Sequence, residues 1–340
     1  MMARQVTIQD VAAEAGVSLQ TVSRVINGKP DVAEETRKRV WQVARRLGYR
    51  PSSIARSLVS QRTYTLGLIT CPVNDQFRAE VITGAEREAR ERGYVFVLAI
   101  TDGNPDDIPL MYNLMLERQV DGLLLFAPSV SPQESIEFNL PLVSLTYRVE
   151  NDHAINVDVD NVDGAYQATH HLTGLGHRRV GVVAGPLGWR AAADRTEGAR
   201  RALAEVGQPL DNSWVEAASD WTLDAGYSAA RALLARHPDC TALFCHNDWI
   251  ALGAYRALKE LGRRIPEDVS VVGYDDLPIC DYASPPLASV RQPRIALGEL
   301  LAQLLVGAVE RGMSARQDML VRAEFVPRGS IAPAPQVCSQ

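Results

Sequence analysis

Seven short apolar runs, separated by stretches with helical periodicity, constrain the fold of this chain more than any other feature. From Thr65 onward they read "TLGLIT", "YVFVLAI", "VDGLLLFAP", "PLVSLT", "RVGVVAGP", "TALFCHND" and "VSVVGYDD". Apolar strands that alternate with helices are typical of βαβ units, in which parallel strands lie buried between layers of helix. The sequence therefore predicts an α/β body with buried parallel sheets.

Polar and aromatic side chains follow several of these runs. Ligands of open parallel sheets bind beyond the carboxyl ends of the strands, so a site is expected among these residues. They are Asp102, Tyr147, Arg148, Arg195, Trp221, Asn247, Asp248, Asp275 and Asp276. Carboxylates, amides and guanidinium groups pair with hydroxyls, and a Trp ring covers the C–H face of a sugar. The set predicts a polyhydroxylated ligand.

Taken singly, these residues have plainer interpretations. A lone Trp such as Trp221 is more often a core residue than a ligand platform. An Arg on a helix, such as Arg195, is more often part of a surface ion pair. Their shared position at strand ends favours a binding site.

The first 62 residues carry a charge opposite to that of the rest. They hold 11 Arg and Lys against 5 Asp and Glu, a net charge of +6, and the chain as a whole carries −6, which leaves −12 for the remainder. A charged patch acts locally, over about a Debye length of roughly 8 Å. The basic head is therefore predicted to meet a polyanion, although a merely solvated basic face would have the same charge.

Three short amphipathic helices are predicted within this head. Thr7 can cap the first, which Gly16 ends, and Ser18 can cap the second, which closes at Asn27. A third is predicted over residues 34–47. Because none can bury its apolar face alone, the three should share one small core. The inward residues are Ile8, Val11, Ala12 and Ala15, then Val22, Val25 and Ile26, then Val40, Val43, Ala44 and Leu47.

The first two helices and their glycine-containing turn have the pattern of a helix-turn-helix. In that motif the N-terminal residues of the second helix reach base edges in the major groove. Here these residues are Leu19, Gln20 and Arg24. Gln can pair with adenine, Arg with guanine, and Leu can meet a thymine methyl group. The pattern predicts recognition of double-stranded DNA, and the alternative is a helical hairpin that only packs.

The stretch "VTIQDVAAEAGVSLQTVSRVINGKPDVAEETRKRVWQVARRLGYRP" closely resembles the heads of the LacI/GalR transcription regulators. The resemblance implies a DNA-binding head over residues 1–50. One departure is Ala33, where the family usually has a capping Ser or Thr, so the third helix should lose roughly 1 kcal/mol unless Asp31 substitutes. The implied contacts in the head are Thr7, Ser18, Leu19, Gln20, Thr21, Ser23, Arg24 and Asn27.

A connector, residues 51–62, follows the head. Its sequence "SSIARSLVSQRT" is compatible with a helix but too short to be stable as a free helix in water. The resemblance implies a hinge helix that orders on operator DNA, with Ala55 and Leu58 in the minor groove and Leu58 wedging a base step. Ser52 stands where Asn is common and is not counted as a contact. A plain interdomain linker is the alternative.

The resemblance continues through "LTGLGHRRVGVVAGP", "NDWIALGAYRALKELGRRIPEDVSVVGYDD" and "PPLASVRQPRIALGELLAQLL". It implies a three-helix helix-turn-helix head on a periplasmic-binding-protein-like α/β core of two doubly wound parallel-sheet subdomains. The N-subdomain would comprise residues 63–160 with 292–323. The C-subdomain would comprise residues 161–291 with 324–331, and residues 332–340 form a tail.

The subdomains of this family close on a small effector. By matching motif, Arg195, Trp221, Asn247 and Asp275 fall on positions that contact galactosides in the lactose-repressor branch. Tyr147 and Arg148 replace a common Asp-Arg pair, which leaves the ligand open in that corner. The implied effector contacts are Asp102, Tyr147, Arg148, Trp189, Arg195, Trp221, Asn247 and Asp275, with packing an equal alternative for Trp189.

The resemblance implies a homodimeric repressor that binds operator DNA under the control of a small sugar. The alternatives are a cytoplasmic sugar-binding protein without a DNA role and a co-repressor-dependent regulator with a non-sugar effector. A sugar-active enzyme would need an acid and a base near the ring, for which Asp102 and Asp275 form the one candidate pair. The tail lacks the heptad zipper that the tetrameric branch needs.

Other signals point to no further chemistry. The five cysteines form no CxxC, and "GLGHRRVG" lacks a third glycine and precedes a strand, so neither a metal nor a dinucleotide cofactor is predicted. His170, His171 and His177 are interpreted as solvated helix-end residues, and no enzymatic motif appears. The start lacks the layout of a secretory signal, so a cytoplasmic, nucleoid-associated protein is expected.

Overall fold

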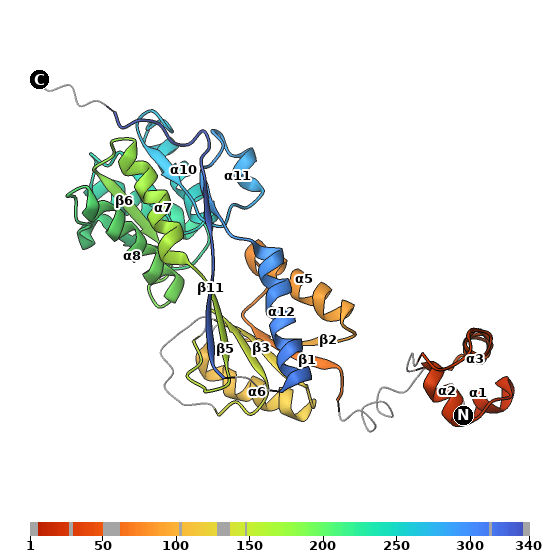
Figure 1. Cartoon of the computed structure of the whole chain (residues 1–340). Coiled ribbons are helices and arrows are strands. Elements are labelled where there is room, and N and C mark those ends of the chain that lie inside the picture. Colours follow the sequence, from red (N-terminus) through yellow and green to blue (C-terminus); the bar gives the residue numbers. More distant parts are fainter. Residues whose placement is uncertain are drawn as a thin grey trace, which may run out of the picture. The chain divides into compact units, whose positions relative to one another are not determined.

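The computed structural model describes residues 6–26, 30–49, 62–101, 104–127, 137–146, 148–312 and 315–335. The chain divides into two compact units, Met1–Tyr64 and Thr65–Gln340 (Figure 1). Five predicted contacts lie outside the described residues, as do residues 51–61 of the connector. These contacts are Asn27, Ala55, Leu58, Asp102 and Tyr147.

The first unit contains the three predicted helices, α1 (Ile8–Ala15), α2 (Leu19–Ile26) and α3 (Glu34–Leu47). Thr7 forms a capping box with Asp10, and the Ser18 hydroxyl accepts from the Thr21 N–H at 3.1 Å. Gly16 ends α1 in the left-handed conformation, with φ of 63°. The buried residues come from all three helices, which confirms the shared core: Val11, Ala12, Ala15, Val22, Val25, Val40, Val43 and Ala44.

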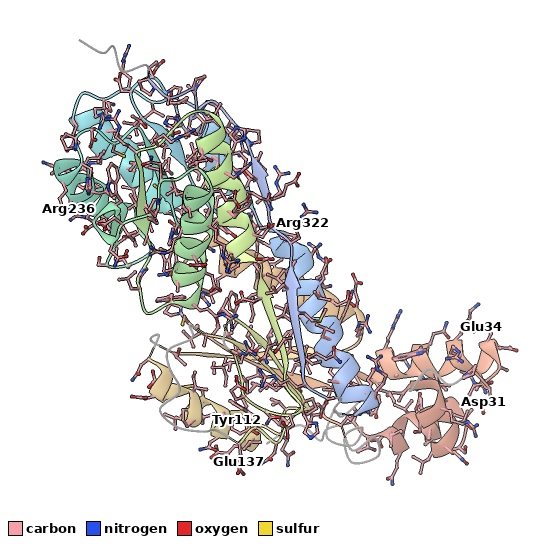
Figure 2. All side chains as sticks on the ribbon, turned by 60° about the vertical axis from the view of Figure 1, so that its left-hand side comes forward. Asp31, Glu34, Tyr112, Glu137, Arg236 and Arg322 are labelled. Carbon is pink, nitrogen blue, oxygen red and sulfur yellow. The ribbon has the colours of Figure 1, made fainter. Side chains whose placement is uncertain are left out.

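The start of α3 has no side-chain cap. Ala33 occupies the N-cap position and makes no capping hydrogen bond. Asp31 does not substitute, because its carboxylate forms an ion pair with Arg24, each side chain being about half exposed. Figure 2 labels Asp31 beside Glu34, the first residue of α3. The missing cap leaves a position where stability can be gained.

The body begins with a six-stranded sheet in the order β2-β1-β3-β4-β5-β11, and all its neighbouring pairs are parallel. Its strands are β1 (Thr65–Thr70), β2 (Val95–Ile100), β3 (Gly122–Phe126), β4 (Leu142–Leu145), β5 (Ile155–Val159) and β11 (Gln317–Val321). The associated helices are α5 (Gln76–Glu91), a 3₁₀ turn (Pro105–Asp107), α6 (Ile108–Glu117) and α12 (Arg294–Arg311). Helices α5 and α12 lie side by side (Figure 1), and a Cβ on Gly298 would lie 1.9 Å from the Val81 carbonyl oxygen.

A second, four-stranded parallel sheet has the order β7-β6-β8-β9. Its strands are β6 (Val180–Ala184), β7 (Val215–Ala217), β8 (Ala242–Cys245) and β9 (Ser270–Val272). The helices are α7 (Asn161–Gly174), α8 (Arg190–Glu205), a 3₁₀ turn (Asn212–Trp214), α9 (Leu223–Arg236), α10 (Asp248–Glu260) and α11 (Ile279–Tyr282). An antiparallel pair, β10 (Ser289–Arg291) with β12 (Glu324–Val326), completes the described elements.

Both sheets contain a point where the strand order reverses. In the first, β1 lies between β2 and β3, and in the second, β6 lies between β7 and β8. At such a switch point the loops that leave neighbouring strands diverge, and a crevice opens at the carboxyl ends. Each sheet therefore provides one edge of a crevice, at the carboxyl ends of its strands. The parallel α/β body that the sequence predicts is confirmed.

Two expectations about burial are wrong. The run at Val95–Ile100 was expected to be a buried strand, but β2 is an edge strand, and the Val95 side chain is 60% exposed. His177 is fully buried rather than solvated, and its ring nitrogens lie 3.0 Å from Thr241 Oγ1 and 3.1 Å from Ser270 Oγ. Burial lowers the pKa of His177, so the neutral ring acts as a structural link.

The described residues contain neither a membrane-spanning helix nor a cluster of metal-binding side chains. No described helix is long and apolar enough to span a bilayer. Within the described ranges, no group of three or more His, Cys, Asp or Glu side chains is arranged to hold a metal ion.

Candidate ligand-binding site and nucleic-acid interface

A cavity of about 110 Å³ lies where the two crevice edges meet, and five aromatic side chains of the described residues line it. We call it the aromatic compartment. Phe126 ends β3, and Trp189, Trp221 and Asn247 come from the loops after β6, β7 and β8. The described residues that line it are Asp75, Phe77, Arg78, Phe126, Thr146, Asp158, Val159, Asn161, Trp189, Arg190, Ala191, Arg195, Trp221, Asn247, Trp249, Asp275, Leu277 and Gln292.

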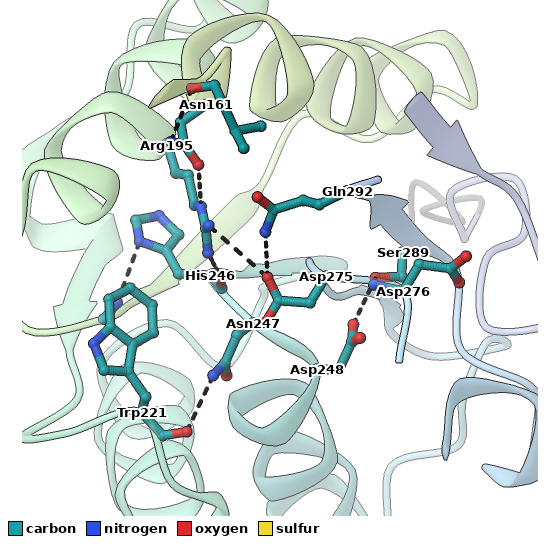
Figure 3. Close-up of polar contacts among 12 residues, drawn as sticks. Asn161, Arg195, Trp221, His246, Asn247, Asp248, Asp275, Asp276, Ser289 and Gln292 are labelled. Carbon is teal, nitrogen blue, oxygen red and sulfur yellow. Dashed lines mark hydrogen bonds and ion pairs between the residues drawn. The ribbon is translucent and has the colours of Figure 1, made fainter. Parts of the chain in front are cut away.

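Arg195, which lines this compartment, is held by contacts with several neighbours (Figure 3). Its Nε donates to Asn161 Oδ1 at 2.8 Å, and its Nη1 donates to the His246 carbonyl oxygen. Its guanidinium lies 3.7 Å from the Tyr274 ring centroid and 3.9 Å from Asp275 Oδ1. The side chain is buried, so the alternative of a surface ion pair is wrong. A fixed guanidinium presents donors in a constant direction.

Asp275 is held in an uncommon backbone conformation. Its φ is 104°, which non-glycine residues rarely adopt, and its N–H donates to the Val290 carbonyl oxygen at 2.8 Å. Its Oδ1 accepts from Gln292 Nε2 at 2.6 Å. Burial raises the pKa of Asp275, and the positive charges of Arg195 and Arg294 oppose that rise. The strained backbone thus aims a carboxylate at Arg195 and the compartment.

Trp221 forms a wall of the compartment, and three neighbouring residues determine its position. Asn247 Nδ2 donates to the Trp221 carbonyl oxygen at 3.1 Å, while Asn247 Oδ1 caps α10 by accepting from Ile250 N–H at 2.7 Å. The rings of Trp221 and Trp189 meet edge to face, with centroids 5.7 Å apart. Gly185 leaves room for the indole, because an added Cβ would lie 2.3 Å from Trp221 Cη2.

The opposite wall comes from the first sheet. The Arg78 Nη1 donates at 3.1 Å both to Thr70 Oγ1 and to the Phe126 carbonyl oxygen, which joins the ends of β1 and β3. Asp158, near the end of β5, lies 3.8 Å from the Arg190 Nε at the start of α8. Burial raises the pKa of Asp158 to about 6, although Arg190 opposes the rise. This ion pair joins the walls supplied by the two sheets.

The structure brings most of the described effector candidates together. Trp189, Arg195, Trp221, Asn247 and Asp275 line the aromatic compartment, whereas Arg148 lines an adjoining cavity. Two other strand-end residues point elsewhere and serve the fold. Asp248 Oδ2 accepts from Leu277 N–H at 2.7 Å, and Asp276 Oδ1 accepts from Arg328 Nη1 at 2.6 Å.

Sequence reasoning missed most of the described residues that the first sheet contributes to the aromatic compartment. Asp158 lies at the carboxyl end of a strand and Asp75 in the loop that follows one, so the rule applied to the other strands would have found both. For Asp158 the signal was hidden because "INVDV" contains polar residues and does not have the pattern of a buried strand, whereas Asp75 follows β1, a strand that the sequence does predict, and was overlooked. The missed lining residues include Asp75, Phe77, Arg78, Phe126, Thr146, Asp158, Asn161, Arg190, Trp249 and Gln292.

The head presents the predicted base-reading residues at the surface of α2. Leu19 is 46% exposed, and Gln20 and Arg24 are exposed beside it. Leu19 lies outside the buried core of the head, and an apolar side chain exposed at the start of this helix suits contact with a base methyl group. Of the other implied contacts, Thr7 and Ser18 act as helix caps, the Thr21 hydroxyl lies 2.9 Å from Ser18 Oγ, and Ser23 is partly buried.

The chain was compared with known families and proteins. Residues 7–52 match the model for bacterial regulatory proteins of the lacI family, and residues 169–331 match that for a periplasmic binding protein-like domain. The HTH-type transcriptional regulator CelR of Thermobifida fusca is 39% identical over 90% of this chain and 92% of its own length.

Two solved structures are similar over nearly the whole chain. The transcriptional regulator CelR–cellobiose complex is 35% identical, with a TM-score of 0.73, and the match covers 96% of this chain and 100% of that one. A lac repressor dimer bound to operator and the anti-inducer ONPF is 28% identical, with a TM-score of 0.85, and the match covers 97% of this chain and 100% of that one.

Proposed function

This chain belongs to the lacI family of bacterial regulatory proteins and is an effector-controlled transcriptional repressor, and we propose a ligand for it. The proposed effector is a carbohydrate that binds in the aromatic compartment. The observation that carries the proposal is the pair of Trp189 and Trp221 rings beside the fixed groups of Arg195 and Asp275. Aromatic faces cover the C–H face of a sugar, and the charged groups pair with its hydroxyls. The cellobiose complex of a relative supports this ligand class.

The proposed effector contacts are Trp189, Arg195, Trp221, Asn247 and Asp275, while Asp102 and Tyr147 remain predictions from the sequence. The proposed DNA contacts are those implied in the head, with Leu19, Gln20 and Arg24 reading bases. Ala55 and Leu58 remain predictions for the hinge. The family consists of regulatory proteins rather than enzymes. We place the protein in the cytoplasm, associated with the nucleoid.

The proposed mechanism couples two sites. A homodimer places two heads on the half-sites of a pseudo-palindromic operator, as a lac repressor dimer bound to operator supports. We retain the two proposed subdomains, residues 63–160 with 292–323 and residues 161–291 with 324–331. A sugar that bridges them alters their closure and thereby the order of the hinge. Such coupling is typically about 1–3 kcal/mol, or about 5- to 150-fold in operator affinity.

The test is a fluorescence anisotropy titration of the full chain on an operator obtained by in vitro selection. Adding ribose, glucose, galactose, cellobiose or lactose should change the operator Kd at least fivefold for one of them. A fall in affinity identifies an inducer, and a rise identifies a co-repressor. If no carbohydrate changes the operator Kd, while a non-sugar metabolite does, the carbohydrate proposal is wrong.

A further inference from the structure

A second cavity, of about 230 Å³, adjoins the aromatic compartment, and we call it the polar compartment. Thr146, Asp158 and Arg190 line both cavities, so the two spaces share a wall. The rest of the polar compartment is formed by β5, β11 and Arg148. Strands β5 and β11 belong to the six-stranded sheet, whereas Arg190 begins α8, which packs on β6 of the other sheet. A bound molecule would therefore contact elements of both sheets.

The polar compartment presents cationic and anionic groups in balance. Arg148 Nη2 lies 3.1 Å from Asp318 Oδ2, and Asp318 Oδ1 accepts from Asn156 Nδ2 at 2.8 Å. Arg190 and Asp158 form the second pair. A phosphate or carboxylate would meet the carboxylates as well as the guanidinium groups, which offsets its attraction. A hydroxyl can accept a hydrogen bond from a guanidinium group and donate one to a carboxylate, so the lining suits a neutral polyol.

The two compartments differ in their apolar surfaces. The aromatic compartment has flat rings on its walls, whereas the apolar lining of the polar compartment, among the described residues, is aliphatic and includes Val157, Met319 and Leu320. The Leu320 side chain is 65% exposed and open to a ligand. A ring can therefore stack in the first space, while a connected unit is held in the second mainly by hydrogen bonds and aliphatic contact.

We propose that the polar compartment is a second sugar subsite, and that the effector is a disaccharide or longer neutral glycoside. Its first ring stacks in the aromatic compartment, and the adjacent unit pairs with Arg148, Asp318 and Arg190. The proposal rests on the proposed function, because it requires a carbohydrate in the aromatic compartment. It assigns a ligand-binding role to β11, a strand that lies 162 residues from its partner in β5.

The test measures binding by isothermal titration calorimetry on the full chain. The probes are glucose and galactose, the disaccharides cellobiose and lactose that contain them, and glucose 6-phosphate. The variant Arg148→Ala removes one guanidinium, while Asp318 keeps Asn156 and the Arg316 contact at 3.4 Å. The matched control is Arg179→Ala, because Arg179 is also a partly exposed arginine with an ion pair, to Asp239, but lines neither compartment.

We expect a disaccharide to bind at least tenfold more tightly than its parent monosaccharide. Arg148→Ala should weaken disaccharide binding at least fivefold and monosaccharide binding less than twofold, and Arg179→Ala should change neither. The proposal is overturned if the monosaccharide binds as tightly as the disaccharide, if Arg148→Ala weakens both equally, or if glucose 6-phosphate binds most tightly. A monosaccharide that alone releases the operator would leave the proposed function standing. If no sugar binds, both proposals are wrong.

Discussion

Gly185 leaves the space in which the Trp221 indole lies. An alanine there would place its Cβ 2.3 Å from Trp221 Cη2, so the ring must move. Overpacking of this kind typically costs about 1–3 kcal/mol. We predict that Gly185→Ala weakens effector binding at least tenfold in a calorimetric titration. The matched control is Gly188→Ala in the same loop, where an added Cβ meets nothing within 4 Å; equal losses in both variants would contradict the role of Trp221.

Asp158 links the stability of the body to pH. Burial raises its pKa to about 6 from an ordinary value of 3.8. The folded chain therefore binds the proton more tightly than the unfolded chain, and the free energy of unfolding falls as pH rises from about 3.8 to about 6, the interval in which the unfolded carboxyl ionises and the folded one does not.

We predict that Asp158→Asn, which cannot ionise, raises the free energy of unfolding by up to about 3 kcal/mol at pH 7.5 and by much less at pH 4.5. Arg190 keeps Asp194 as a partner at 3.4 Å. Urea denaturation at both pH values measures the difference, with Asp239→Asn, in an exposed ion pair, as the control. A gain of equal size at the two pH values would refute the prediction.

At the scale of single elements, α3 begins without a side-chain cap. Ala33 has φ of −53° and ψ of 139° and makes no side-chain capping hydrogen bond. A serine at such a position typically contributes about 1 kcal/mol. We predict that Ala33→Ser slows amide hydrogen exchange in α3 about fivefold, as measured by mass spectrometry on the full chain. Ala13→Ser, at an exposed position within α1, should not slow exchange in its helix; the same slowing there would argue against capping.

At the scale of the whole molecule, the part of the chain that is proposed to bind DNA and the part that is proposed to bind the effector carry opposite net charges. The first 62 residues carry +6 while the rest carry −12, so DNA binding should depend on the release of counterions from the DNA phosphates that the basic head neutralises. We predict that raising NaCl from about 50 to 200 mM lowers operator affinity at least tenfold and changes affinity for a neutral sugar less than twofold. Anisotropy and calorimetry measure the two. Parallel salt dependences would contradict separate sites.

Local patterns in the sequence determined the head and the alternation of strands and helices. Caps at Thr7 and Ser18 act on residues three positions away, and apolar spacing repeats within one or two turns, so neighbouring residues suffice to specify these elements. The rule that ligands bind beyond the carboxyl ends of parallel strands likewise selected Arg195, Trp221 and Asn247, and all three line the aromatic compartment. The rule works from sequence because the connection of a parallel strand to a helix already sets the direction of the strand.

Tertiary structure alone decided which distant segments meet. Asp318 reaches Asn156 across 162 residues, and the His177 ring reaches groups 64, 93 and 155 residues away, which made it a core residue rather than a solvated one. The pairing of β11 with β5 likewise created the polar compartment. No spacing encodes these contacts, because they depend on which distant segments come to lie side by side once the chain has closed the long loops between them.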